Sequence, residues 1–352
     1  MSRQKLVVAV DLLGSDKGPE EIAEGVRLAM RALGHSVTIL PVGPASLVHE
    51  LRSGTGIRLD CVTDVVVTPQ DSLPEVLRKT ESSVVIVTRM VASKKADALF
   101  SCGDTRAAVL WAARDADKGG IGRIDGVRRP PLALVIPTLK QGKVVILDAG
   151  ANVECSPEDL LCFARLGVTF VGAMIRLAGP VRVGLLSNGE EPTKGNTLTR
   201  AAFELLTEQL PGFAAEFVGN VQPTDAISGE VDVVVADGFV GNIDFKAMEA
   251  GVEMVMTSLR RHLMVSWRTR IGALLARPAF EGVKRDLAPE EFGAMPLLGV
   301  DGIVMIGHGN SDYRAVAKGI EEAAEYVRRG LADRIKEAMG SIPATAVTGE
   351  IP

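Results

Sequence analysis

Residues Val181 to Thr199 read VRVGLLSNGEEPTKGNTLT, and this stretch decides the fold. It begins with an apolar run that ends at Leu186, as a buried parallel strand does. A polar loop rich in glycine and asparagine follows, and an apolar helical pattern starts at Ala201. The order strand, glycine loop, helix places the loop at the carboxyl end of a sheet, where open α/β folds bind their ligands.

This loop has the chemistry of an anion site. Lys194 supplies a full positive charge, and the following helix supplies unpaired N–H groups and the positive end of its dipole. The loop is not a Walker loop, because Lys194 lacks the glycine that precedes the lysine in that motif. The stretch therefore predicts a site for phosphate, with Asn196 beside Lys194.

Composition limits the class of function. The chain has 352 residues, of which 47% are apolar and 24% charged, as is ordinary for a globular protein with a substantial core. Aromatic residues make up only 4% and the net charge is −5, which disfavours a nucleic-acid binder. The four cysteines form no CxxC and the four histidines no HxxxH pair. We therefore expect no metal site, and we expect no other cofactor. We also expect the protein to work in a reducing environment.

No targeting or membrane-spanning segment is expected. The first apolar run meets Asp11 too early for a signal peptide, and no uninterrupted run is long enough to cross a bilayer. We therefore expect a cytoplasmic protein, either soluble or bound to a membrane surface.

Six predicted strands end in loops rich in glycine, asparagine and aspartate. In a single loop, the geometry of a turn is enough to explain these residues. A series of such loops along one edge of a sheet instead predicts a ligand site. We expect an α/β protein in three layers (α/β/α), with a doubly wound, mostly parallel but mixed sheet and a protruding helical arm. The catalytic domain is predicted at 1–340 and a flexible tail at 341–352. Strands are expected at 6–10, 37–42, 65–68, 98–101, 132–136, 144–147, 181–186, 213–218, 231–236 and 303–306, with 132–136 and 144–147 forming a hairpin.

Residues 255–290 are predicted to form a basic amphipathic helical arm. Arginine and lysine outnumber acids between Ser258 and Asp286, and apolar residues are interspersed among them. Such an arm lies on an anionic membrane, docks an acidic carrier protein, or pairs with a second copy of the chain, and the sequence leaves these uses open. The expected contact residues are Arg260, Arg261, Trp267, Arg268 and Arg270.

Taken together, the loops resemble those of the PlsX-type phosphate acyltransferase family of bacterial phospholipid synthesis. The similar segments follow the family's order and cover nearly the whole chain. They are DLLGSDKGP at 11–19, RPPLA at 129–133, DAGANVEC at 148–155, GLLSNGEEPTKGN at 184–196, GNV at 219–221, DGFVGN at 237–242, and PLLGVDG with HGNSD between 296 and 312.

The resemblance implies transfer of a fatty acyl group from acyl carrier protein to inorganic phosphate, giving acyl phosphate. With the basic arm, we further expect peripheral attachment to an anionic membrane and a homodimer. Lys194 is then expected to hold phosphate, Asn242 to polarise the thioester carbonyl, and His308 to move a proton or donate to the oxyanion. Further substrate-binding or phosphate-binding residues are expected at Asp11, Gly14, Asp16, Asp148, Asn152, Asn196, Asp237, Gly241 and Ser311. The family's chemistry does not require Cys102 as a covalent nucleophile.

Several positions depart from the family pattern. Leu12 replaces a small residue in the first loop, Asp104 and Arg106 replace asparagine and glycine near a helix start, and Met295 adds bulk. Two alternatives therefore stay open. One is a divergent paralogue that uses another acyl thioester, and the other is a non-catalytic, membrane-associated scaffold that binds acyl carrier protein. A nicotinamide-dependent dehydrogenase is disfavoured, because no GxGxxG follows the first predicted strand.

Overall fold

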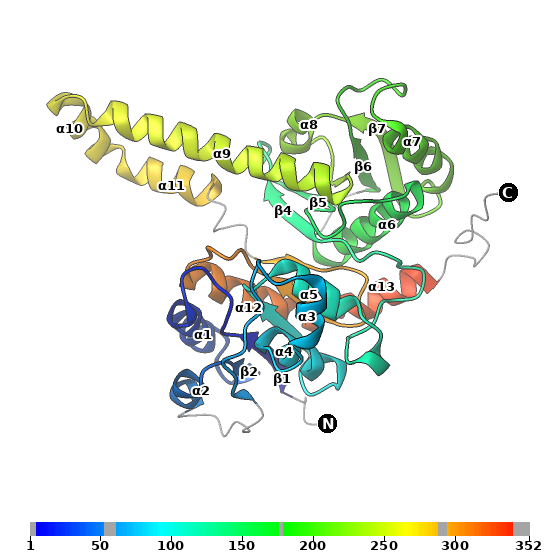
Figure 1. Cartoon of the computed structure of the whole chain (residues 1–352). Coiled ribbons are helices and arrows are strands. Elements are labelled where there is room, and N and C mark those ends of the chain that lie inside the picture. Colours follow the sequence, from blue (N-terminus) through cyan, green and yellow to red (C-terminus); the bar gives the residue numbers. More distant parts are fainter. Residues whose placement is uncertain (1–4, 53–60, 176–178, 288–293, 341–352) are drawn as a thin grey trace.

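The computed structural model describes residues 5–52, 61–175, 179–287 and 294–340. Its strands form two five-stranded sheets, in the orders β2-β1-β3-β10-β9 and β4-β5-β8-β6-β7. Figure 1 shows β1 and β2 in one part of the molecule and β4 to β7 in another. The first sheet contains β1 (Leu6–Asp11), β2 (Val37–Val42), β3 (Ala98–Ser101), β9 (Met295–Pro296) and β10 (Ile303–Ile306). The second sheet contains β4 (Ala133–Pro137), β5 (Lys143–Leu147), β6 (Val181–Leu186), β7 (Ala215–Val221) and β8 (Val233–Val235).

Both sheets are mixed and mostly parallel, so the predicted α/β class is confirmed. In the first sheet only β9 runs antiparallel to its neighbour, and in the second only β4 does. The antiparallel pairing of β4 with β5 confirms the predicted hairpin. Buried parallel strands are continuous apolar runs in sequence, which explains why most of them could be located.

The strands are divided over two sheets rather than collected in one. An isolated antiparallel bridge between Leu132 and Leu297 links the edge of the first sheet to the start of β4. The backbone N–H of Leu298 also donates to the carbonyl oxygen of Pro131 at 2.9 Å. Because β9 has only two residues, this contact between the two sheets stays short.

The predicted strand at 65–68 is wrong. Side chains satisfy the backbone of this segment where a neighbouring strand would otherwise do so. Lys79 Nζ donates to the carbonyl oxygen of Val66 at 2.9 Å, and the N–H of Thr68 donates to Asp71 Oδ2 at 2.7 Å. A short apolar run is ambiguous in sequence, and here local hydrogen bonds decided against the ladder.

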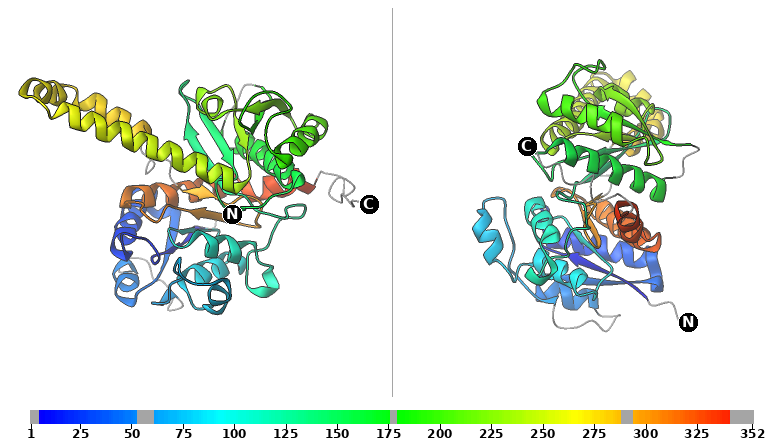
Figure 2. Two further views of the ribbon diagram at one scale, coloured as in Figure 1. Left: turned by 45° about the horizontal axis from the view of Figure 1, so that its top comes forward. Right: turned by 90° about the vertical axis from the view of Figure 1, so that its right-hand side faces the viewer.

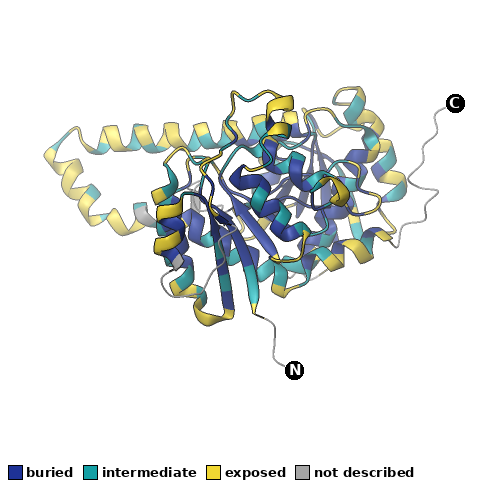
Figure 3. Ribbon diagram, turned by 60° about the horizontal axis from the view of Figure 1, so that its bottom comes forward, coloured by how far each residue is buried: buried dark blue, intermediate teal, exposed yellow. Residues whose placement is uncertain are grey.

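Helices cover the sheets, and their apolar faces form the core with the strands (Figure 3). On the first sheet α1 (Pro19–Leu33) packs beside α12 (Tyr313–Arg328). Proline at the first position of α1 and two acids in its first turn suit a helix start, as the sequence predicts. The other helices of the body are α2 (Ala45–Arg52), α3 (Leu73–Arg78), α4 (Ser83–Ala92), α5 (Thr105–Ala113), α6 (Pro157–Met174), α7 (Thr197–Gln209), α8 (Pro223–Ser228) and α13 (Leu331–Gly340).

A helical arm projects from the second sheet, as predicted. Helix α9 (Gly238–Leu263) has 26 residues and extends away from the body, and α10 (Trp267–Leu275) and α11 (Arg277–Leu287) fold back along it (Figures 1 and 2). The helix starts much earlier than residue 255, because Asp237 caps it directly after β8. One continuous helix of about 39 Å therefore joins the DGFVGN loop to the tip of the arm.

Candidate active site

Three loops of the first sheet contact one another at the carboxyl ends of β1, β3 and β10. Gly14 has a φ of +84°, and a Cβ there would lie 2.7 Å from the Cα of Gly103, so this close approach needs glycine. The N–H of Asp16 donates to the carbonyl oxygen of Gly309 at 2.8 Å. These contacts bring together five of the predicted residues: Asp11, Gly14, Asp16, His308 and Ser311.

Asp11 is buried at the end of β1 and shapes the loop that follows it. Its Oδ1 accepts from the N–H of Leu13 at 2.9 Å, and its Oδ2 accepts from Ser101 Oγ at 2.7 Å. Burial raises the pKa of Asp11 to about 6, against hydrogen bonds that lower it. The side chain therefore orients two neighbouring loops.

His308 is exposed at the end of β10. Its Nδ1 accepts a hydrogen bond from the N–H of Asn310 at 3.1 Å, which leaves Nε2 of the neutral ring as the protonated nitrogen. Ser311, one turn further on, is buried and hydrogen-bonds the thiol of Cys102. Burial raises the pKa of Cys102 to about 12, so the thiolate is scarce near neutral pH and this cysteine is a poor nucleophile.

On the second sheet, Asp148 organises the loop after β5. Its Oδ1 accepts from the N–H groups of Leu132, Gly150 and Ala151 at 2.9 to 3.1 Å. Its Oδ2 accepts from both the backbone N–H and the side-chain amide of Asn152 at 2.7 and 2.8 Å. Burial raises the pKa of Asp148, and these hydrogen bonds favour the charged form. Five donors occupy the carboxylate, so it acts as an internal anchor of the loop.

The first turn of α9 packs directly on this loop. The N–H of Gly238 donates to the carbonyl oxygen of Asn152 at 2.8 Å. A Cβ on Gly241 would lie 2.1 Å from the carbonyl oxygen of Asp148, so only glycine fits there. A Cβ on Gly150 would lie 3.3 Å from Cβ of Asn242, which places the Asn242 side chain against this glycine.

Asp237 and Asn196 cap helices. Asp237 Oδ1 accepts from the N–H of Val240 at 2.8 Å at the start of α9, and Asn196 Oδ1 accepts from the N–H of Thr199 at 2.9 Å at the start of α7. Both residues therefore have a structural use that accounts for their side chains in this structure.

Lys194 is exposed in the loop between β6 and α7. Its methylenes cover Gly189, where a Cβ would lie 2.9 Å from Lys194 Cγ. Because β6 and β8 are parallel neighbours, this loop and the start of α9 follow adjacent strands. Within residues 5–52, 61–175, 179–287 and 294–340, no hydrogen bond or ion pair joins Lys194 to Asn242 or His308.

The predicted residues thus form two groups, one on each sheet, with a backbone link between them that the sequence reasoning did not assign. Asn152 Nδ2 donates to the carbonyl oxygen of Pro130 at 2.9 Å, and Leu298 donates to that of Pro131. Both prolines belong to the RPPLA segment. Proline has a backbone carbonyl that accepts hydrogen bonds but no N–H group to donate one. In the sequence, only the RPPLA motif indicated that this segment matters.

The departures from the family pattern have structural explanations. Asp104 caps α5 by accepting from the N–H of Ala107 at 2.9 Å, and Arg106 pairs with Asp104 while donating to the carbonyl oxygen of Pro69 at 3.1 Å. Leu12 is fully buried against Gly43. Met295 lies in β9, opposite Ile306.

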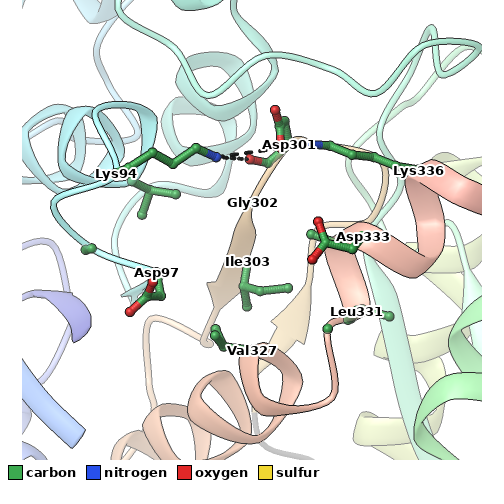
Figure 4. Close-up of a pocket in the computed structure, with 13 residues that line it drawn as sticks. Lys94, Asp97, Asp301, Gly302, Ile303, Val327, Leu331, Asp333 and Lys336 are labelled. Atoms are coloured by element: carbon green, nitrogen blue, oxygen red, sulfur yellow. Dashed lines mark hydrogen bonds and ion pairs between the residues drawn. The ribbon is translucent and has the colours of Figure 1, made fainter. Parts of the chain in front are cut away.

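One cavity of about 170 Å³ lies at the other end of the first sheet (Figure 4). It is next to Asp97 and Gly302, which precede β3 and β10, and Lys94 and Lys336 both pair with Asp301 there. Ligands of α/β folds bind at the carboxyl ends of strands, so this cavity is separate from the candidate site.

In the part of the chain that the structure describes, no helix is both long and apolar enough to cross a membrane.

Comparison with known proteins identifies the family. The family model described as "Fatty acid synthesis protein" matches residues 6–334. The phosphate acyltransferase of Pelotomaculum thermopropionicum is 39% identical over 348 residues, covering 98% of each chain. That of Acidobacterium capsulatum is 38% identical over 343 residues, covering 96% of this chain and 98% of its own.

Among solved structures, a phosphotransacetylase from Streptococcus pyogenes has a TM-score of 0.51 at 16% identity, covering 96% of this chain and 95% of its own, which shows a shared fold. The resemblance of the loops to PlsX-type phosphate acyltransferases is confirmed by the family match and by relatives of nearly equal length. The chain therefore belongs to the fatty acid synthesis protein family.

Proposed function

We propose that the chain is an enzyme that transfers a fatty acyl group from acyl carrier protein to inorganic phosphate and releases acyl phosphate. Family membership supports the reaction class. The structural observation that supports it best is the position of the Asn242 turn and the Lys194 loop, which follow the adjacent parallel strands β8 and β6. Asn242 can then hold the thioester carbonyl, and Lys194 the phosphate, at the same edge of the second sheet.

The proposed reaction needs positioning more than proton removal, because phosphate is already a nucleophilic anion near neutral pH. Lys194 and the N–H groups at the start of α7 hold phosphate. A phosphate oxygen attacks the thioester carbonyl carbon, and the amide of Asn242 donates to the oxyanion that develops. The C–S bond then breaks, and the leaving thiolate takes up the proton that the attacking hydrogen phosphate gives up, with His308 passing it from one to the other. Asp11 and Asp148 hold the loops that carry these groups.

The arm has an apolar stripe that suits a second copy of the chain. Val240, Ile243, Ala247, Ala250 and Met254 are exposed on α9 at alternating spacings of three and four residues. This is the seam of paired helices, and the buried residues Gly238, Gly241 and Phe245 lie on the opposite side. We propose that this stripe forms a homodimer.

The tip of the arm suits an anionic surface. Trp267 is 67% exposed with the guanidinium of Arg268 at 5.4 Å from its ring, and Arg260 and Arg261 are exposed in the last turn of α9. We propose that the tip, together with Arg270, contacts an anionic membrane, so that a cytoplasmic protein attaches peripherally. The same arginines would attract acidic acyl carrier protein.

The test is to incubate the purified protein with hexadecanoyl-acyl carrier protein and phosphate, and to measure acyl phosphate as its hydroxamate. Phosphate-dependent product is the expected result. Absence of product with a panel of acyl chain lengths, beside an active phosphate acyltransferase from a relative, would reject the enzyme and favour the scaffold alternative. Product only with another thioester would favour the divergent paralogue.

A further inference from the structure

Two exposed apolar side chains lie beside the candidate site, next to loops that are otherwise mostly polar. Phe239, in the first turn of α9, is 56% exposed, and Val153, after the Asp148 loop, is 63% exposed. Single exposed apolar residues are normal on a protein surface. Phe239 directly follows Gly238, and Val153 directly follows Asn152. The N–H of Gly238 donates to the carbonyl oxygen of Asn152 at 2.8 Å, so the two chain segments that carry Phe239 and Val153 are held together.

Phe239 is also close to Asn242 along the helix. The two residues are three positions apart, so their side chains project from one side of α9. The Asn242 side chain in turn lies against Gly150 of the Asp148 loop. An apolar ring and the amide assigned to the carbonyl therefore share one surface at the mouth of this loop.

A fatty acyl thioester places methylene groups directly after its reacting carbonyl carbon. A carbonyl held by Asn242 brings the first of these methylenes to the apolar surface beside it. We propose that Phe239 and Val153 form the wall that binds the first methylenes of the acyl chain and so determine the preference for long over short acyl groups. This inference rests on the proposed role of Asn242. It adds a specificity surface to that function.

A second copy of the chain is the competing occupant of this surface. The dimer stripe defined above passes through Val240 and Ile243, and Phe239 lies between that stripe and Asn242 on the helix. If Phe239 binds the acyl chain, Phe239→Ala keeps the molar mass of the unmodified protein in solution. If Phe239 contacts a second copy, the variant has a lower molar mass.

The experiment compares Phe239→Ala and Val153→Ala with Leu139→Ala as the matched control. Leu139 is 79% exposed in the turn between β4 and β5, at the opposite end of β5 from Asp148. For each protein, kcat/KM is measured at saturating phosphate with hexadecanoyl-acyl carrier protein and with acetyl-acyl carrier protein, whose acyl group has no methylene. For each protein we also measure the binding of acyl carrier protein that bears a hexadecyl thioether, and the molar mass in solution.

We expect Phe239→Ala to lower kcat/KM for the hexadecanoyl substrate about 15- to 60-fold, since each methylene removed from water is worth about fourfold in affinity and two or three are involved. The loss for the acetyl substrate is at least tenfold smaller, and Val153→Ala shows the same pattern with a smaller loss. Leu139→Ala changes neither value. An equal loss with both substrates, or no loss with either, overturns the wall.

A fall in molar mass for Phe239→Ala also overturns it, because a second copy then covers the ring. If the unmodified protein makes no acyl phosphate, the proposed function fails on its own. The wall is then supported by weaker binding of the thioether by Phe239→Ala than by Leu139→Ala, and overturned by equal binding.

Discussion

Asn152 donates two hydrogen bonds to one oxygen of Asp148, from its backbone N–H at 2.7 Å and from its side-chain amide at 2.8 Å. The same amide also donates to Pro130, and the carbonyl oxygen of Asn152 accepts from Gly238 at the start of α9. A single residue thus ties three chain segments around a buried carboxylate. Residues that we assigned to substrate from the sequence are here engaged in building the site.

Asp148→Asn should destabilise the protein. The new amide nitrogen would face N–H donors, leaving buried polar groups unpaired at a cost of about 2–5 kcal/mol. Thermal unfolding should show a lower midpoint together with lost turnover, whereas Asp237→Asn should be nearly neutral because asparagine caps helices as well as aspartate does. An unchanged midpoint with a raised KM for phosphate would instead make Asp148 a phosphate ligand.

Lys194→Ala should separate binding from folding. The lysine is exposed, so the unfolding midpoint should stay within about 1 °C, as for most surface changes. Loss of its charge should lower kcat/KM for phosphate by about 100-fold, with partial recovery in Lys194→Arg. Lys140→Ala, an exposed lysine in the β4–β5 turn, is the control. Equal kinetics for both alanine variants would remove Lys194 from the mechanism.

Asp11 should make stability depend on pH. Its pKa is about 6 in the folded protein against 3.8 for the free side chain, so protons bind the folded state more tightly. The contribution is present in full below pH 3.8 and is lost as pH rises through 6, a total of about 3 kcal/mol. The free energy of unfolding of the wild-type protein should therefore fall relative to that of Asp11→Asn as the pH rises from 4 to 6.5. Denaturation at several pH values measures it, and a constant difference would refute the assignment.

The arm should bind anionic vesicles through its tip. Trp267→Ala and the double charge reversal of Arg260 and Arg261 to glutamate should each reduce co-sedimentation with vesicles containing phosphatidylglycerol. Each cation near such a surface contributes about 1 kcal/mol, so the double reversal should weaken binding by at least 30-fold. Vesicles of phosphatidylcholine alone serve as the control. Binding that does not depend on lipid charge would assign these arginines to another partner.

Much of the fold could be predicted because buried parallel strands appear in sequence as apolar runs that end in turn residues. The strand at 65–68 failed because the side chains of Asp71 and Lys79, shortly after it in the chain, satisfy its backbone. The site was harder to predict, since Asp148 looks the same in sequence whether its oxygens meet a substrate or five internal donors. Asp104 likewise stood out in the sequence as a departure from the family pattern near a helix start, and the structure shows that it caps this helix.

The start of α9 offers the sharpest test of how the loops are joined. A Cβ on Gly241 would lie 2.1 Å from the carbonyl oxygen of Asp148, whereas one on Gly251, ten residues further along the same helix, meets nothing within 4 Å. Gly251→Ala should therefore stabilise the helix by up to about 1 kcal/mol through its higher propensity. Gly241→Ala should push α9 off the Asp148 loop and displace Asn242, costing about 2–4 kcal/mol and most of the turnover. Thermal unfolding and kcat measure both effects. If the two variants behave alike, the close packing of α9 on this loop does not position Asn242, and the amide must be held by other contacts.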